Sequence, residues 1–212
     1  MFDYNLAHWI TFFTAAILLN LSPGPDMIFI VSQTSKRGIR SGFASVFGIW
    51  IGTFVHVIFA ALGLSAILMT SALAFSIVKW IGAIYLVWIG IQSIRSKGSN
   101  NFKIDDDVAT KNLYKSLRQG FLVSLLNPKV AIFFLAFLPQ FVEPFAGTVS
   151  SQLFLHGSLI IVVAAFIEIP MILISGKLIN YLNKNEKVSL WLDRGLGSLL
   201  VLLGLKLATT NN

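Results

Sequence analysis

Apolar residues in this chain fall into six long runs, separated by short polar connections. About 20 consecutive apolar residues are enough for a helix to cross a lipid bilayer, and a tilted or broken helix needs more. Every run meets that length, so the pattern predicts an all-α membrane protein with six transmembrane helices. The predicted spans are 6–35, 42–69, 72–94, 117–142, 150–176 and 189–208.

The first and fourth runs are each interrupted by a proline motif that also carries a charge. Residues 22–26 read Ser-Pro-Gly-Pro-Asp, and residues 127–129 read Asn-Pro-Lys. Interrupted hydrophobic segments in corresponding positions of two halves are the best sequence indication of a transporter's binding site. We therefore predict that substrate is bound by Ser22, Pro23, Gly24, Pro25, Asp26, Asn127, Pro128 and Lys129.

The two breaks divide the chain into two halves of three predicted helices each. Residues 1–94 form the first half, and residues 117–212 form the second. Residues 95–116 are rich in polar and charged side chains, and we interpret them as a cytoplasmic linker. Because three is an odd number, the second half crosses the membrane in the opposite sense, which predicts two inverted-topology repeats.

Charged residues make up only 12% of the chain, about half the fraction that is usual in soluble domains. Most of the 16 Lys and Arg residues lie within 36–40, 95–118 and 177–194, which are alternate connections between the predicted helices. Basic residues collect in cytoplasmic connections of membrane proteins, so this distribution places both termini outside the cytoplasm. It also argues against a nucleic-acid partner, since no single basic patch forms.

Four motifs of the sequence resemble the LysE/RhtB family of small amino-acid exporters. They are the broken segments 21–26 and 120–129, the glycine-containing segment 37–42, and the Leu-Pro-Gln-Phe segment 138–141. The six predicted helices and the polar linker also resemble that family, so the resemblance covers nearly the whole chain. It implies a bacterial cytoplasmic (inner) membrane protein that exports an amino acid or a related metabolite by proton antiport. It does not identify the substrate.

The chemistry of a helix break suits a zwitterion. A proline inside a helix leaves the carbonyl four residues earlier without its donor, which here frees Leu19, Leu21 and Ser124. The helix that restarts after the break presents free N–H groups and a positive dipole end to an anion. The alternative interpretation of each break is a kink that serves only helix packing.

Asp26 and Lys129 are charges within predicted spans, where each costs at least ~2.5–3 kcal/mol unless it finds a partner or water. In one interpretation Asp26 binds the substrate ammonium group or the coupling proton, and Lys129 binds the substrate carboxylate. In the other, the two side chains pair with each other as a structural clamp.

Two further residues are candidates for carrying the coupled proton, beside Asp26. Glu168 precedes Pro170 in the fifth predicted span, and buried carboxyl groups serve as proton relays in transporters. His56 lies in the second span, and histidine titrates in the physiological range. The alternatives are a buried hydrogen bond for Glu168 and a packing role for His56.

The sequence gives no indication of an enzyme, a metal site or a cofactor. It contains no cysteine, and its histidines lack the spacing of metal ligands. The remaining alternatives to an exporter are a passive small-solute channel and a membrane assembly protein without transport. The spacing of Gly48 and Gly52 allows close helix approach, either within the chain or in a homodimer.

Overall fold

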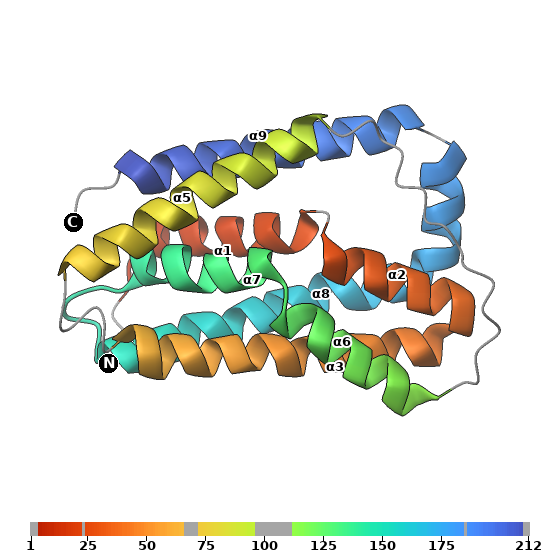
Figure 1. Ribbon diagram of the computed structural model, residues 1–212, viewed down its shortest axis with the longest axis horizontal. Helices are drawn as coiled ribbons and strands as arrows, with labels where there is room; N and C mark the ends of the chain where they lie inside the picture. Colours follow the sequence, from red (N-terminus) through yellow and green to blue (C-terminus); the bar gives the residue numbers. More distant parts are fainter. Residues whose placement is uncertain (1–3, 23, 66–71, 96–111, 185, 210–212) are drawn as a thin grey trace.

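A computed structural model describes residues 4–22, 24–65, 72–95, 112–184 and 186–209, and within these ranges the chain contains helices and no strand (Figure 1). Most elements are α-helices, η1 and η2 are short π-helical segments, and η3 is a 3₁₀ turn. Their bounds are α1 Leu6–Leu21, α2 Pro25–Arg37, α3 Ile39–Phe59, η1 Ala60–Leu64, α5 Ala72–Arg95, α6 Leu113–Leu125, α7 Pro128–Ile132, η2 Phe133–Phe137, η3 Leu138–Phe141, α8 Val149–Lys184 and α9 Glu186–Thr209.

Both proline motifs end one helix and begin another, as the sequence predicts. The axes of α1 and α2 differ by 53°, and those of α6 and the segment that begins at Pro128 differ by 46°. Pro25 and Pro128 each occupy the first turn of the new helix, where a missing N–H costs no hydrogen bond. Pro23, which we also predicted to bind substrate, lies outside the described residues.

Two stretches of the described chain are long and apolar enough to cross a membrane, Ile39–Leu64 and Val149–Ser175. The number rises to four if each bent pair counts as one span. These helices indicate a multi-pass membrane protein, while the count of six and the inverted repeat stay predictions. The proposed linker lies mostly outside the described residues, since nothing is described between Arg95 and Asn112.

The α3 and α6 helices pack along each other at very short range, and α5 packs along α9 in the same way (Figure 1). Glycine permits the first contact, because a Cβ at Gly48 would collide with the Leu117 carbonyl and one at Gly120 with the Ser45 carbonyl. A Cβ at Gly52 would lie 2.7 Å from the Phe121 carbonyl. The Gly48/Gly52 spacing therefore serves a contact within the chain.

The start of α1 and the C-terminal end of α9 lie at the same end of the bundle, at the left of Figure 1. The junction of α2 with α3 and the start of α6 lie at the opposite end. That second end carries basic side chains of three described elements, among them Arg37, Arg40 and Lys115. Within the described residues, the start of α1 and the end of α9 thus lie at the opposite end of the long axis from these basic side chains.

We expect Gly48→Ala to destabilise the protein by about 1–3 kcal/mol or more, because the added methyl group forces α3 away from α6. Gly63→Ala is the matched control, since nothing lies within 4 Å of a Cβ built at Gly63. Membrane abundance and thermal unfolding of the detergent-solubilised variants measure the difference. Equal stability of the two variants would contradict the close contact of α3 with α6.

Candidate functional site

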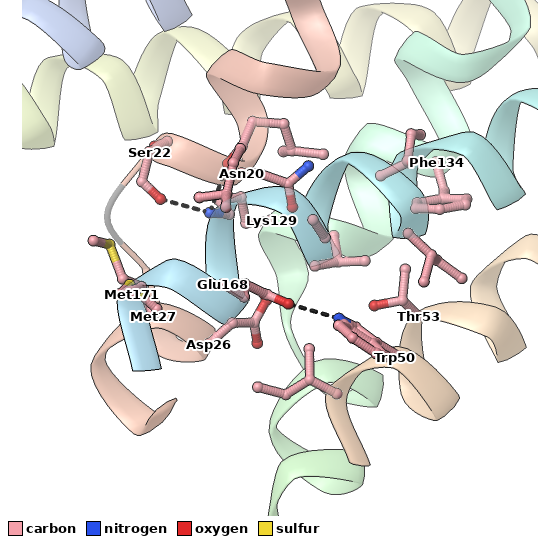
Figure 2. A pocket seen from close by; sticks show the side chains of 17 residues that line it. Asn20, Ser22, Asp26, Met27, Trp50, Thr53, Lys129, Phe134, Glu168 and Met171 are labelled. Atoms are coloured by element: carbon pink, nitrogen blue, oxygen red, sulfur yellow. Dashed lines mark hydrogen bonds between the residues drawn. The ribbon is translucent and has the colours of Figure 1, made fainter. Parts of the chain in front are cut away.

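The two broken helices meet at a buried cavity in the middle of the bundle (Figure 2). Side chains from α1, α2, α3, α7 and α8 line it, so both halves of the chain contribute. Its volume is about 30 Å³, room for a few water molecules at most. The polar residues that line it are Asn20, Ser22, Asp26, Trp50, Thr53, Lys129 and Glu168.

The Lys129 side chain caps the C-terminal end of α1. Its ammonium group donates hydrogen bonds to the carbonyl of Leu19 at 3.1 Å and to the carbonyl of Ser22 at 2.9 Å. The Leu19 carbonyl is one of those that the proline motif was predicted to free. Gly24 leaves room for this contact, because a Cβ there would lie 3.0 Å from the ammonium nitrogen. A cation from the second half thus binds the carbonyl end of α1.

Asn127 joins the two breaks through its side-chain amide. Its Oδ1 accepts a hydrogen bond from the backbone N–H of Lys129 at 3.0 Å and caps α7. Its Nδ2 donates to Asp26 Oδ2 at 2.9 Å. Asn127 is only 2% exposed, so both groups of this amide are used inside the protein. The first turn of α2 and the first turn of α7 are thereby held together.

The carbonyl freed at the second break also finds a donor. Ser124 accepts a hydrogen bond from the N–H of Asn127 at 3.0 Å, and His56 Nε2 lies 3.3 Å from the same oxygen. The Ser124 hydroxyl lies 3.0 Å from that of Thr53. His56 therefore contacts the second break from α3 and is not among the residues that line the cavity.

Glu168 reaches the cavity from α8 and accepts a hydrogen bond from the indole N–H of Trp50 at 2.6 Å (Figure 2). Its side chain is buried, with 7% of the residue exposed. A carboxyl oxygen accepts a hydrogen bond more strongly when the carboxyl group is ionised. Trp50 therefore fixes the direction in which the Glu168 carboxyl group points.

Two buried polar atoms of the cavity wall have no hydrogen-bond partner among the described residues: Asp26 Oδ1 and the Ser22 hydroxyl. Buried polar atoms in proteins are nearly always paired, and each exception calls for an explanation such as a ligand or water. Both atoms belong to residues that line the cavity. They are available to a bound molecule.

The structure gathers most of the residues that the sequence indicated. Ser22, Asp26, Lys129 and Glu168 line one cavity, while Gly24, Pro25, Asn127 and Pro128 form the two helix breaks around it. Sequence reasoning missed three polar residues of the wall, which are Asn20, Trp50 and Thr53. The indole of Trp50 was a usable signal, because an N–H in the middle of a span needs a buried acceptor.

No group of three or more His, Asp or Glu side chains is placed to hold a metal ion within the described ranges. The site offers hydrogen-bond donors, acceptors and charges, and it does not bring a nucleophile next to a base.

Two broken helices that surround a buried polar cavity define the membrane transporter class, in which interrupted helices present backbone groups to the transported molecule. A family model agrees. The chain belongs to the LysE type translocator family, whose model matches residues 17–211. The resemblance that the sequence motifs indicated is thus confirmed.

Individual relatives match most or about two thirds of the chain. The chain is 29% identical over 213 residues to the homoserine/homoserine lactone efflux protein of Salmonella typhimurium, covering 96% of this chain and 97% of the relative. It is 33% identical over 138 residues to an uncharacterized membrane protein of Vibrio cholerae, covering 64% and 65%. A membrane protein of Pseudomonas aeruginosa is 29% identical over 94% of both chains. No solved structure matches the chain.

We expect Trp50→Phe to destabilise the protein by about 1.5–3 kcal/mol, the usual contribution of a hydrogen bond to a charged group. The loss should be greater above neutral pH than in acid, because the indole N–H stabilises the charged carboxylate of Glu168 more than the protonated form. Trp80→Phe, on an exposed tryptophan of α5, is the matched control and should change stability by less than about 0.5 kcal/mol. Thermal unfolding at several pH values measures both. An equal loss at all pH values would contradict a Glu168 carboxyl group that titrates beside the indole.

Proposed function

We propose that this chain exports an amino acid, or a similar small zwitterionic metabolite, from the cytoplasm by proton antiport. The observation that carries the proposal is the cavity between the two breaks, where the carboxyl groups of Asp26 and Glu168 lie in one wall with the ammonium group of Lys129. The name of the Salmonella relative supports amino-acid efflux as the activity.

Both charges of a zwitterion find complementary groups in this cavity. The free Asp26 Oδ1 accepts hydrogen bonds from a substrate ammonium group, and the Ser22 hydroxyl lies in the same wall. The α2 helix begins at Pro25, and its N-cap residue Gly24 offers no side-chain hydrogen bond. The backbone N–H groups of its first turn are therefore open to a substrate carboxylate. Lys129 adds a positive charge beside them.

The excess of carboxyl groups over ammonium groups couples substrate to protons. If Asp26 and Glu168 were both ionised, Lys129 would offset only one of them, and an uncompensated charge in a buried site is costly. A proton on either carboxyl group removes the excess. A substrate ammonium group pairs with Asp26 only while that carboxyl group carries no proton, and Lys129 and the first turn of α2 offset the substrate carboxylate. Proton and substrate therefore compete for the same groups. A carrier that changes from one open state to the other only with either a proton or a substrate molecule bound is an antiporter.

The conformation in the structure is an occluded one, because the cavity holds a few waters and not a whole substrate. Transport requires that the cavity widen and open to each side of the membrane in turn. The two breaks are the places where α1 can move relative to α2, and α6 relative to α7. This requirement also argues against a passive channel, in which a continuous water-filled path would be open.

In our proposed orientation the basic end of the bundle faces the cytoplasm, and both termini face outward from the inner membrane of a bacterium. The support is the distribution of basic side chains over the junction of α2 with α3 and the start of α6 (Figure 1). This orientation assumes that α5 and α9 also cross the membrane. Each has 24 residues, which is about 36 Å of helix.

Efflux from proteoliposomes tests the function. The purified protein is reconstituted into vesicles loaded with labelled homoserine, and the outside is made more acidic than the inside. We expect several-fold faster loss of label than from loaded vesicles that lack the protein. A protonophore should abolish this difference. Efflux that does not depend on the proton gradient would indicate a channel. Efflux no faster than from protein-free vesicles would indicate an assembly protein or another substrate.

Pro128→Ala should leave membrane abundance unchanged and remove most of the export. The substitution restores a backbone donor and favours a continuous helix through residues 124–128, which withdraws the Ser124 carbonyl from His56. Pro144→Ala, in an exposed loop, is the matched control and should export normally. Full export by the Pro128 variant would reduce the second break to a packing kink.

Glu168→Gln should separate substrate movement from proton movement. The amide cannot release a proton, yet it still offers an oxygen to Trp50. We expect exchange of labelled for unlabelled substrate across the vesicle membrane to continue at a substantial rate. Net efflux driven by a proton gradient should fall at least about tenfold, the change expected when one coupled titrating group is lost. Undiminished gradient-driven efflux would assign the proton to Asp26 alone.

A further inference from the structure

A second cluster of ionisable side chains lies outside the cavity, at the end of the bundle where α1 and α8 begin. It consists of His8 from α1, His156 from α8 and Glu143 from the loop before α8. On α8 the cluster is one helical turn before Ile160, which lines the cavity. Fourteen helical positions separate His8 from Ser22, a distance of about 21 Å along the axis of α1. The proposed transport chemistry uses none of these residues.

The hydrogen positions of the histidine pair follow from their partners. Nδ1 of His156 lies 2.9 Å from the backbone carbonyl of Gln152, which can only accept, so this nitrogen carries a hydrogen. The Nε2 atoms of His8 and His156 lie 2.9 Å apart, so one must donate and the other accept. Neutral His156 has its hydrogen on Nδ1 and therefore accepts. His8 donates.

Glu143 favours a positive charge on His8. One carboxylate oxygen of Glu143 lies 3.6 Å from His8 Nδ1, and a hydrogen on that nitrogen turns the contact from repulsive to attractive. The imidazole of His8 is 6% exposed, whereas the Glu143 side chain is half-exposed at 51%. All three contacts are satisfied when the histidine pair carries one proton more than two neutral imidazoles. His8 is then charged, and its Nε2–H donates to neutral His156.

The surroundings of the pair leave little room for water or for other charges. Tyr4 stacks on His8 with ring centres 4.2 Å apart, and Trp9 stacks on His156 at 5.5 Å. Tyr4 donates its hydroxyl hydrogen to Gln152 Oε1 at 2.9 Å. Burial and the Glu143 carboxylate raise the pKa of Tyr4, so this hydroxyl stays protonated. Among the described side chains on the elements packed here, Tyr4 and Glu143 are the ionisable groups that face the pair.

A second proton is incompatible with this arrangement. If His156 Nε2 also bound a proton, two N–H groups would point at each other across 2.9 Å, and two positive charges would share a buried contact. The contact would have to break, and with it the connection between the start of α1 and the start of α8. The α1 helix leads directly from His8 to the first break at Ser22.

We propose that His8 and His156 form a proton-binding site that latches this end of the bundle, closed with one shared proton and open with two. The inference deepens the proposed antiport, because in the proposed orientation the site faces the acidic side of the membrane. A proton arriving from outside then opens the path through which substrate leaves. The same opening gives protons access to Asp26 and Glu168.

The test measures opening without relying on transport. The chain has no cysteine, so a single Thr53→Cys substitution places a unique thiol in the cavity wall. A membrane-impermeant thiol reagent is added to right-side-out vesicles without substrate or gradient, at external pH values between about 5 and 8, and rates are corrected for reagent reactivity with an exposed Cys at Phe145. We expect labelling to fall roughly tenfold per pH unit above the opening midpoint, as one titrating proton requires.

Two variants decide the assignment. His156→Gln keeps an acceptor for His8 but cannot be protonated, so labelling should stay slow at every pH. Glu143→Gln alters a half-exposed side chain, so the protein should fold normally, and the midpoint should shift to lower pH because the proton on the pair loses its counter-charge. The proposal is overturned if the parent shows no pH dependence, if His156→Gln keeps the parent's dependence or labels fast at every pH, or if Glu143→Gln leaves the midpoint unchanged.

The labelling experiment and the efflux experiment test the two proposals independently. A pH-dependent opening that depends on His156, in a protein that exports none of the substrates tried, would support the latch and contradict the proposed function. Proton-driven efflux with an opening that ignores pH would do the reverse.

Discussion

A backbone carbonyl inside a bilayer must find a hydrogen-bond donor, because no water is present to replace one that is lost. The rest of this structure depends on that constraint. The breaks in the first and fourth predicted helices leave carbonyls of Leu19, Ser22 and Ser124 outside regular helix hydrogen bonding. Lys129 binds the first two, and His56 lies against the third. In each case the side chain comes from the other half of the chain. The first break depends on Lys129 for its donors, while the Ser124 carbonyl at the second break also accepts from the backbone N–H of Asn127.

The hydrogen bonds from Lys129 to the carbonyls at the first break place a charged side chain in the middle of the bundle. Lys129 would be costly in an apolar environment on its own, and Asp26 and Glu168 lie in the same cavity wall. The arrangement leaves one carboxyl group in excess, with free acceptor atoms on Asp26 and Ser22. The lysine that satisfies the freed carbonyls therefore also contributes a charge to the cavity, and in our proposal this charge helps to select the bound molecule. This is why binding substrate and binding protons belong to one mechanism in our account.

The sequence predicted the features that depend on local patterns. Proline marks both breaks, with glycine beside it in the first, and long apolar runs predict the helices. Pro128 correctly identifies the Ser124 carbonyl as the one that loses its helical donor. The sequence left open whether Lys129 pairs with Asp26 or binds the substrate carboxylate. It did not indicate the backbone carbonyls that Lys129 contacts, which lie 110 and 107 positions away in the chain. The pairing of Trp50 with Glu168 spans 118 positions, and that of His8 with His156 spans 148. Such contacts follow from how the helices pack, which the apolar pattern does not specify.

The central claim is that the two breaks form a single substrate site that opens to each side of the membrane in turn. It is tested most directly by replacing Ser22 with the chain's only cysteine and measuring its labelling by an impermeant thiol reagent. The measurement is made in right-side-out and in inverted vesicles, with and without homoserine or another transported amino acid. The account predicts labelling from both faces and protection by substrate at both. Labelling from one face only, or labelling that a transported substrate does not slow, would contradict it.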